Sequence, residues 1–213
     1  STVTIATDSN KVLESAKAFG ANCILTSMEH SSGTQRLAEA VNILNMEDDD
    51  IVVNVHADEP LIPSTIIQQV AAALTTHDNC KVATICHRIH NIDELLDPAV
   101  VKVILNHRGF AMYFSRAPIP WERENFKDSK KIMEHPHYQH VGIYAYRAKF
   151  LNEFLTLPPC ELSSVEDLEQ LRILFHSGRI HVSIADEAIP QGVNTPEDLA
   201  HVQKMFASRR KSA

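Results

Sequence analysis

The chain has 213 residues, a formal net charge of −7, 44% hydrophobic residues and 22% charged residues. This composition is typical of a folded globular protein and excludes a disordered chain. The acidic balance argues against a nucleic-acid partner, and every apolar run falls short of the roughly 20 residues that a membrane span needs. The first residues do not resemble a signal peptide, and the four cysteines lack CxxC spacing, so we expect free thiols in the cytoplasm.

The first ninety residues are predicted to alternate strands and helices. Asp8 or Ser9 is placed to cap the first helix, and Pro63 lies near the start of the third. Ile66, Val70 and Leu74 recur at helical spacing and predict a buried face. Short apolar strands between amphipathic helices indicate a mostly parallel sheet covered on both faces. The strands are expected at residues 3–6, 23–25, 51–55 and 82–85.

The second half of the chain has a different pattern. A hairpin is expected at 101–105 and 111–115, a long loop at 117–139 and a strand at 141–146. We expect a helix from Ser164 with Asp167 as its capping-box partner, a strand at 180–184, and a last helix with Thr195 as N-cap. Residues 1–213 are therefore interpreted as one α/β domain, in which residues 101–147 form an inserted antiparallel subregion.

The strand at 51–55 ends in His56, Asp58 and Glu59. Ligands of open α/β sheets bind beyond the carboxyl ends of the strands, and Mg²⁺ takes one or two carboxylates together with substrate phosphates. Asp58 is therefore a candidate metal ligand. Termination of a strand by polar residues explains the same pattern, and spacing alone leaves both interpretations open.

Other polar segments follow strand ends, although neither GxGxxG nor GxxxxGK[ST] occurs in the chain. Residues 30–36, with Arg36, are suited to a base or phosphate, but they also fit an ordinary capped helix. Arg116 and His140 are suited to an anionic substrate, or to a plain surface. Glu169 and Arg172 have the spacing of an intrahelical ion pair.

Together these segments resemble the CMP-KDO synthetase family, the 3-deoxy-manno-octulosonate cytidylyltransferases of Gram-negative bacteria. The resemblance covers nearly the whole chain, and the number and order of its motifs make it specific. The matching stretches are "IATD", "HSSGTQRLAE", "VNVHADEPLIP", "YFSRAPIPW", "HVGIYAYR", "LEQLRIL" and "GVNTPEDL".

The resemblance implies a Rossmann-like nucleotidyltransferase fold, usually a homodimer, that transfers CMP from CTP to the sugar acid KDO for lipopolysaccharide assembly. Mg²⁺ is the implied cofactor, with Asp58 and Asn194 as metal ligands. Asp58 and Arg116 are the implied catalytic residues. The positions that match the nucleotide pocket are Ser32, Gly33, Thr34, Arg36 and His56. The positions that match the sugar-acid pocket are Arg116, His140, Tyr144, Glu169 and Gln170.

Several positions depart from the family pattern. His56 and Ala57 replace glutamine and glycine, Gln35 replaces an acidic residue, and Asn194 replaces the second metal-binding aspartate. Family members begin further upstream, with a strand and a basic loop for the triphosphate, so we expect slow CTP turnover by this chain alone and a gap between the strands at 3–6 and 51–55. The alternative is a truncated or degenerate, non-catalytic homologue that keeps the fold and dimer surface and binds the sugar acid.

Overall fold

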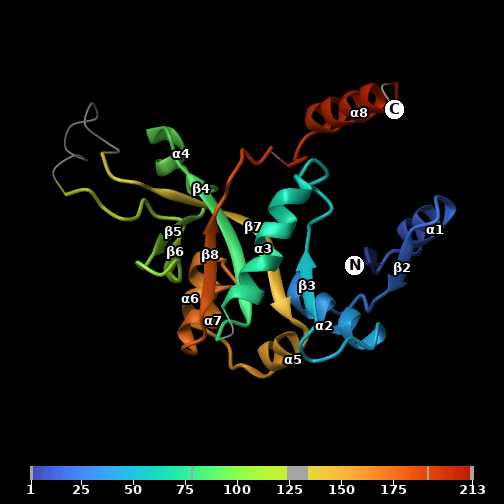
Figure 1. Cartoon of the computed structure of the whole chain (residues 1–213), viewed down its shortest axis with the longest axis horizontal. Helices are drawn as coiled ribbons and strands as arrows, with labels where there is room; N and C mark the ends of the chain where they lie inside the picture. The colour runs from blue at the N-terminus through green and yellow to red at the C-terminus, as the bar shows by residue number, and fades with distance from the viewer. Residues whose placement is uncertain (1, 78, 124–133, 191, 212–213) are drawn as a thin grey trace. The chain divides into compact units, whose positions relative to one another are not determined.

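The computed structural model describes residues 2–77, 79–123, 134–190 and 192–211 (Figure 1). The chain divides into two compact units. The first unit comprises Ser1–Val52 and Tyr146–Pro158, and the second comprises Val53–Ala145 and Pro159–Ala213. The strands β3 (Ile51–Asn54) and β7 (Tyr138–Arg147) each contain a boundary between the units.

The first unit is built on two parallel strands, in which Ile5 lies opposite Cys23. Its first helix begins where the Ser9 side chain accepts a hydrogen bond from the Val12 N–H, as predicted. Gly20 follows this helix with a φ of +80°, a conformation that glycine adopts without steric cost. The elements of the unit are β1 (Thr4–Thr7), α1 (Asn10–Ala18), β2 (Asn22–Leu25), α2 (Gly33–Ile43) and α5 (Ala148–Thr156), and α2 packs against α5.

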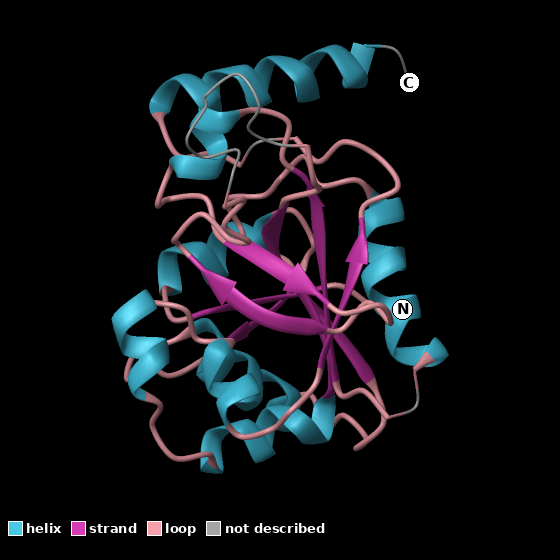
Figure 2. Ribbon diagram, turned by 90° about the vertical axis from the view of Figure 1, so that its left-hand side faces the viewer, coloured by secondary structure: helices cyan, strands magenta, loops and turns pink. Residues whose placement is uncertain are grey.

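The second unit contains most of a twisted, six-stranded sheet with the order β6-β5-β7-β4-β8, in which β3 pairs with β7 (Figure 2). β4 and β8 are parallel, whereas β5 is antiparallel to both β6 and β7, so the sheet is mixed. In the described residues β1 pairs with β2 and forms no ladder with β3. The further elements are α3 (Ser64–Thr76), β4 (Val82–Arg88), α4 (Ile92–Leu96), β5 (Lys102–Leu105), β6 (Ala111–Ser115), α6 (Glu161–Glu166), α7 (Leu171–Phe175), β8 (Ile180–Ile184) and α8 (Pro196–Lys211).

The core of the second unit forms where α3 packs along β4 and β8 (Figure 1). Ile66, Val70 and Leu74 are fully buried on the helix face that their spacing predicts. The expected α/β fold and the antiparallel hairpin are confirmed.

The predicted helix from Ser164 is wrong. Helix α6 already spans Glu161–Glu166, and Asp167 is its C-cap with a φ of 51°, not a partner in a capping box. The left-handed residue ends the helix and lets the following Leu168 become buried. As a result Glu169–Gln170 lie in the turn before α7, and their expected mid-helix position is also wrong.

The predicted boundary between the long loop and the next strand is wrong as well. β7 begins at Tyr138, because Tyr138 and Gln139 pair with Val103 and Lys102 of β5. The His140 N–H continues this contact by donating to the Val101 carbonyl at 2.8 Å. Residues 124–133 of the predicted loop lie outside the described part of the chain.

Candidate active site

The exit of β3 lies against the loop that precedes α8. The Val193 N–H donates to the Asp58 carbonyl at 2.7 Å. A Cβ atom at Gly192 would come within 2.9 Å of the same carbonyl and of the Glu59 carboxylate, so a glycine permits this close approach. Burial, followed by the neighbouring Asp58 charge, raises the pKa of Glu59. The fold thus brings the two predicted metal ligands, Asp58 and Asn194, to one place.

The oxygen donors at this place fit a magnesium ion. Asp58 is exposed and offers a carboxylate, while Asn194 is exposed and offers an amide oxygen. The described residues contain no cluster of three or more His, Cys, Asp or Glu side chains suited to a metal. Mg²⁺ needs no such cage, since it keeps waters and substrate phosphates as its other ligands. The main chain around Asn194 is fixed by Asp198, which accepts hydrogen bonds from the N–H groups of Asn194 and Thr195 at 3.0 and 2.9 Å.

His56 lies on the same strand exit and is exposed. Its Nε2 atom is 3.5 Å from the Asn54 side-chain nitrogen, which is the outer limit of a hydrogen bond. The imidazole is therefore only loosely held and remains open to a ligand.

The predicted nucleotide segment Ser32–Arg36 lies in the first unit, at the N-terminus of α2. The Ser32 side chain accepts from the Gln35 N–H at 3.3 Å, and the Gln35 amide oxygen accepts from the Ser31 N–H at 2.8 Å. These contacts form a reciprocal cap of the helix end. Gln35 fills this role through its oxygen alone, which an acidic residue would also supply, so the departure at Gln35 leaves the cap intact.

The Arg36 guanidinium is engaged within the protein. It lies 2.6 Å from the Asp8 carboxylate and 2.6 Å from the Thr26 hydroxyl, and it also donates to the Ser27 carbonyl at 3.3 Å. Arg36 therefore connects α2 to the residues that follow β1 and β2. The Asp8 carboxylate offsets the charge of the Arg36 guanidinium. Its predicted contact with a nucleotide stays a prediction.

A second side chain of α2 holds the same loop. Glu39 accepts from the Ser27 N–H at 2.8 Å and lies 2.5 Å from the His30 imidazole. The hydrogen bond from Ser27, followed by that from His30, lowers the pKa of Glu39. The loop between β2 and α2 is thus fixed by α2 itself, which preorganises the segment predicted to meet the nucleotide.

Arg116 follows β6 directly and is anchored by backbone carbonyls. Its Nε donates to the Glu166 carbonyl at 2.7 Å, one terminal nitrogen donates to Pro98 at 3.0 Å, and the other donates to Asp167 at 3.3 Å. It also forms an ion pair with the Asp167 carboxylate, which lies 3.9 Å away and is almost fully exposed. The guanidinium is thus oriented by neutral acceptors and keeps its charge for an anion.

His140 is hydrogen-bonded to Thr84 on the neighbouring strand. The Thr84 hydroxyl lies 2.7 Å from the Ile143 carbonyl and 3.0 Å from His140 Nε2. Because a hydroxyl has one hydrogen and the carbonyl can only accept, Thr84 donates to Ile143 and accepts from Nε2–H. Burial lowers the pKa of His140 to about 3. His140 is therefore a neutral side chain whose Nδ1 is an acceptor.

The remaining predicted sugar residues lie on β7 and in the turn before α7. The Tyr144 ring is 5.3 Å from the His140 ring, and Tyr144 is buried. Glu169 and Gln170 occupy the turn that follows Asp167, where Glu169 is exposed and Gln170 is half-buried. The sheet places Arg116 and His140 on either side of residue 102, because Lys102 pairs with both Ser115 and Gln139.

Comparison with known proteins gives consistent results across nearly the whole chain. A family profile described as "Cytidylyltransferase" matches residues 1–184. A curated 3-deoxy-manno-octulosonate cytidylyltransferase from Coxiella burnetii is 49% identical to this chain, and one from Photobacterium profundum is 50% identical. Each alignment covers 96% of this chain and 82% of the relative. The chain belongs to the 3-deoxy-manno-octulosonate cytidylyltransferase family.

A solved structure supports the same conclusion about this cytidylyltransferase fold. The structure of a CMP:2-keto-3-deoxy-manno-octonic acid synthetase complexed with CTP has a TM-score of 0.86 and 35% identity, over 98% of this chain and 82% of the other. The Rossmann-like nucleotidyltransferase fold and the assignment to a nucleotidyltransferase enzyme are confirmed. Among the described residues, no helix combines the length and apolar character that a membrane span needs.

The side chains that fix the residues of this family's motifs were not predicted from the sequence. Asp8 and Glu39 fix the nucleotide segment, while Thr84 fixes His140. Lys102 and Glu166, which hold the peptide of Arg116, were not recognised either. Lys102 gave a detectable signal, since a lysine inside a predicted apolar strand must satisfy its charge within the fold.

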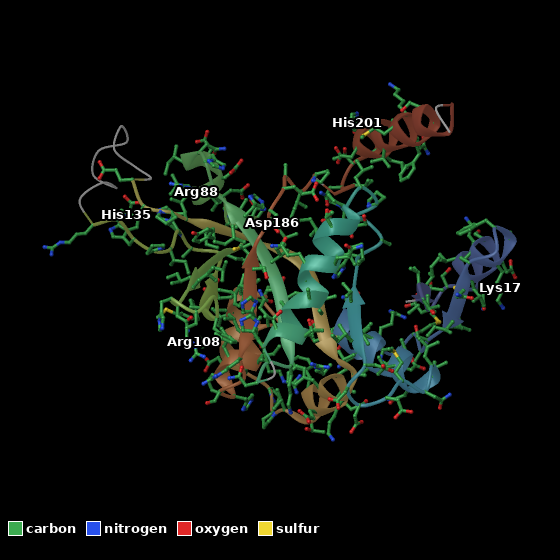
Figure 3. The ribbon with its side chains drawn as sticks, viewed as in Figure 1. Lys17, Arg88, Arg108, His135, Asp186 and His201 are labelled. Atoms are coloured by element: carbon green, nitrogen blue, oxygen red, sulfur yellow. The ribbon has the colours of Figure 1, made fainter. Side chains whose placement is uncertain are left out.

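That Arg116, His140 and Glu169 share one cleft stays a prediction. A hollow of about 700 Å³ lies beside the hairpin of β5 and β6, and its lining includes Leu105 and Tyr138. None of the predicted sugar residues lines it. Arg108 lies in the exposed turn of the same hairpin (Figure 3).

Proposed function

We propose that this protein transfers CMP from CTP to 3-deoxy-manno-octulosonate (KDO), giving CMP-KDO and pyrophosphate for lipopolysaccharide assembly. The observation that carries the proposal is the identity of about one residue in two, over nearly the whole chain, to enzymes named for this reaction. A local motif match would leave the substrate open, whereas this likeness includes every segment predicted to contact the sugar acid.

The charge and protonation of the second unit suit a sugar acid. Arg116 has a cationic group oriented by carbonyls, which pairs well with a carboxylate. His140 is neutral and offers an acceptor to a hydroxyl group. Glu169 and Gln170 offer an acceptor and an amide in the turn that follows Asp167, whose carbonyl contacts Arg116. Arg116 therefore binds the carboxylate in our proposal, and His140, Tyr144, Glu169 and Gln170 contact the rest of the sugar.

The nucleotide and metal positions follow the same logic. Ser32, Gly33 and Thr34 lie at the start of α2, and the N-terminus of a helix suits a base or phosphate. Asp58 and Asn194 would hold Mg²⁺, which when bound offsets the charge that develops on the transferred phosphoryl group. Asp58 would act by holding the metal ion and not by contacting the anionic phosphate directly, and Arg116 orients the sugar acid by pairing with its carboxylate.

We further propose a homodimer in the cytoplasm. The homodimer is expected from the family resemblance, with residues 101–147 as the dimerisation subregion. The cytoplasm is where CTP is available, and the free cysteines suit a reducing compartment.

The test is a pyrophosphate-release assay with CTP, KDO and Mg²⁺, run beside direct binding of KDO by calorimetry. We expect release that needs all three components and is lost in Asp58→Asn, with unchanged thermal stability. Asp93→Asn, an exposed carboxylate on α4, is the control and should keep full activity. Binding of KDO with no pyrophosphate release would favour the non-catalytic homologue, which the asparagine at position 194 makes a specific alternative. Absence of both would refute the proposal.

A further inference from the structure

The end of β6 is held by one carboxylate from a distant segment. Glu166 Oε1 accepts from the Ser115 hydroxyl at 2.6 Å, and Glu166 Oε2 accepts from the Arg116 N–H at 2.8 Å. The main-chain carbonyl of Glu166 accepts from Arg116 Nε at 2.7 Å. Side chain and main chain of one residue thus fix both the peptide and the guanidinium of Arg116.

A buried ammonium group holds the main chain of Arg116 at its carbonyl. Lys102 is fully buried, and its Nζ donates to the carbonyls of Asp97, Val100 and Arg116 at 2.9, 2.7 and 2.6 Å. A buried ammonium is tolerated only when its hydrogens are all bonded. The main chain of Arg116 is therefore hydrogen-bonded to Glu166 through its N–H and to Lys102 through its carbonyl.

Glu166 also connects Arg116 to the other polar residues of the site. It is the last residue of α6, and Asp167 turns the chain by its left-handed conformation. Glu169 and Gln170 follow in that turn, and the Asp167 carbonyl contacts the Arg116 guanidinium. One residue therefore joins the end of β6 to the turn before α7, although the two lie some fifty residues apart in the sequence.

We propose that Glu166, supported by Lys102, is a positioning residue that holds Arg116 ready for the carboxylate of a 2-keto sugar acid. This inference rests on the proposed function, because it deepens the role given there to Arg116. Within the part of the chain that the structure describes, three guanidinium N–H groups bond to main-chain carbonyls, and these bonds fix the direction of the cationic group.

Glu166→Gln is the decisive variant, because it preserves size and removes one of two required acceptors. A glutamine has one oxygen, so its NH₂ group would face either the Ser115 hydroxyl or the Arg116 N–H. We expect the KM for KDO to rise on the order of tenfold through misplacement of Arg116, with the KM for CTP changed less than about twofold. Glu161→Gln, at the exposed start of the same helix, is the matched control and should change neither KM.

A purely structural role predicts a different pattern. It would lower thermal stability and the active fraction while leaving the KM for KDO at its normal value, and that result would overturn the inference. If Glu166→Gln does not fold, Ser115→Ala tests the same contact by releasing one carboxylate oxygen. The expected rise in the KM for KDO is then smaller, about threefold, and an unchanged KM would again overturn it.

Arg116→Ala separates this inference from the proposed function. If Arg116→Ala leaves KDO binding unchanged, the assignment of Arg116 to the sugar acid is wrong, and the role of Glu166 falls with it. If Arg116→Ala abolishes KDO binding while Glu166→Gln preserves it, only the positioning role is refuted.

Discussion

The buried hydroxyl of Thr84 allows a specific prediction, because this one group on β4 forms hydrogen bonds with the neighbouring strand β7 and with the His140 side chain. Thr84 is fully buried on β4, and its hydroxyl lies within hydrogen-bond distance of His140, Val141 and Ile143. Thr84→Val keeps the shape and the β-branch, and it removes the hydroxyl alone. The His140 Nε2–H and the Ile143 carbonyl then lose their shared partner.

The size of the effect follows from these contacts. Losing two buried hydrogen bonds costs about 1 kcal/mol each, and a buried donor left without a partner adds about 1 kcal/mol, partly offset by the apolar methyl group. We therefore expect the free energy of unfolding to fall by about 2–3 kcal/mol, which for a chain of this length lowers Tm by about 4–12 °C. Because the His140 tautomer is no longer fixed, the KM for KDO should rise as well.

Thermal unfolding and steady-state kinetics measure both consequences. Thr75→Val is the matched control, since Thr75 is exposed on α3 and its hydroxyl donates to the Ala72 carbonyl of the same helix. It should change stability by less than about 0.5 kcal/mol. An unchanged Tm and an unchanged KM for KDO in Thr84→Val would refute the assignment of this hydroxyl to both roles.

Three further predictions concern the metal site, the ion pair between Asp8 and Arg36, and stability in acid. Asn194→Asp should tighten Mg²⁺ binding by calorimetry, because it restores a charged oxygen beside Asp58; an unchanged affinity would place position 194 away from the metal. Asp8→Asn should lower the free energy of unfolding by about 1–2 kcal/mol in denaturant titrations, because it removes the charge opposite Arg36. An equal loss in the double variant Asp8→Asn/Arg36→Met would confirm that the two side chains stabilise the fold through their contact with each other. Since the pKa of His140 falls to about 3 in the folded state, the unfolded state binds more protons between that value and about 6.5. Stability should therefore be complete above pH 6.5 and decline as pH falls through this window, with a shallower decline in His140→Asn; an identical pH profile would contradict the burial of His140.

Local chemistry made several elements predictable from the sequence. Ser9 and Thr195 cap their helices as expected, because a hydroxyl before an apolar periodic segment satisfies the free N–H groups of the first turn. The hairpin of β5 and β6 followed from two alternating segments around a turn. These signals depend on residues a few positions apart.

The errors occurred where tertiary contacts decide the outcome. Ser164 and Asp167 have the spacing of a capping box, but the burial of Leu168 favours a helix end with Asp167 in the left-handed conformation. The early start of β7 depends on pairing with β5, which no local pattern contains. The hydrogen bond between Glu166 and Arg116 joins two distant segments, so no local pattern in the sequence indicates that Glu166 supports Arg116.

The distribution of cysteines provides a natural probe of how each unit opens. Cys80, Cys86 and Cys160 are buried in the second unit, whereas Cys23 is half-buried on β2 of the first unit. A thiol reagent reaches a buried cysteine only when its surroundings open. Mass spectrometry of timed labelling would therefore record the opening of the two units separately in the unmodified protein. Binding of KDO should slow labelling at the three buried positions of the second unit, since a ligand that binds the folded state suppresses its opening.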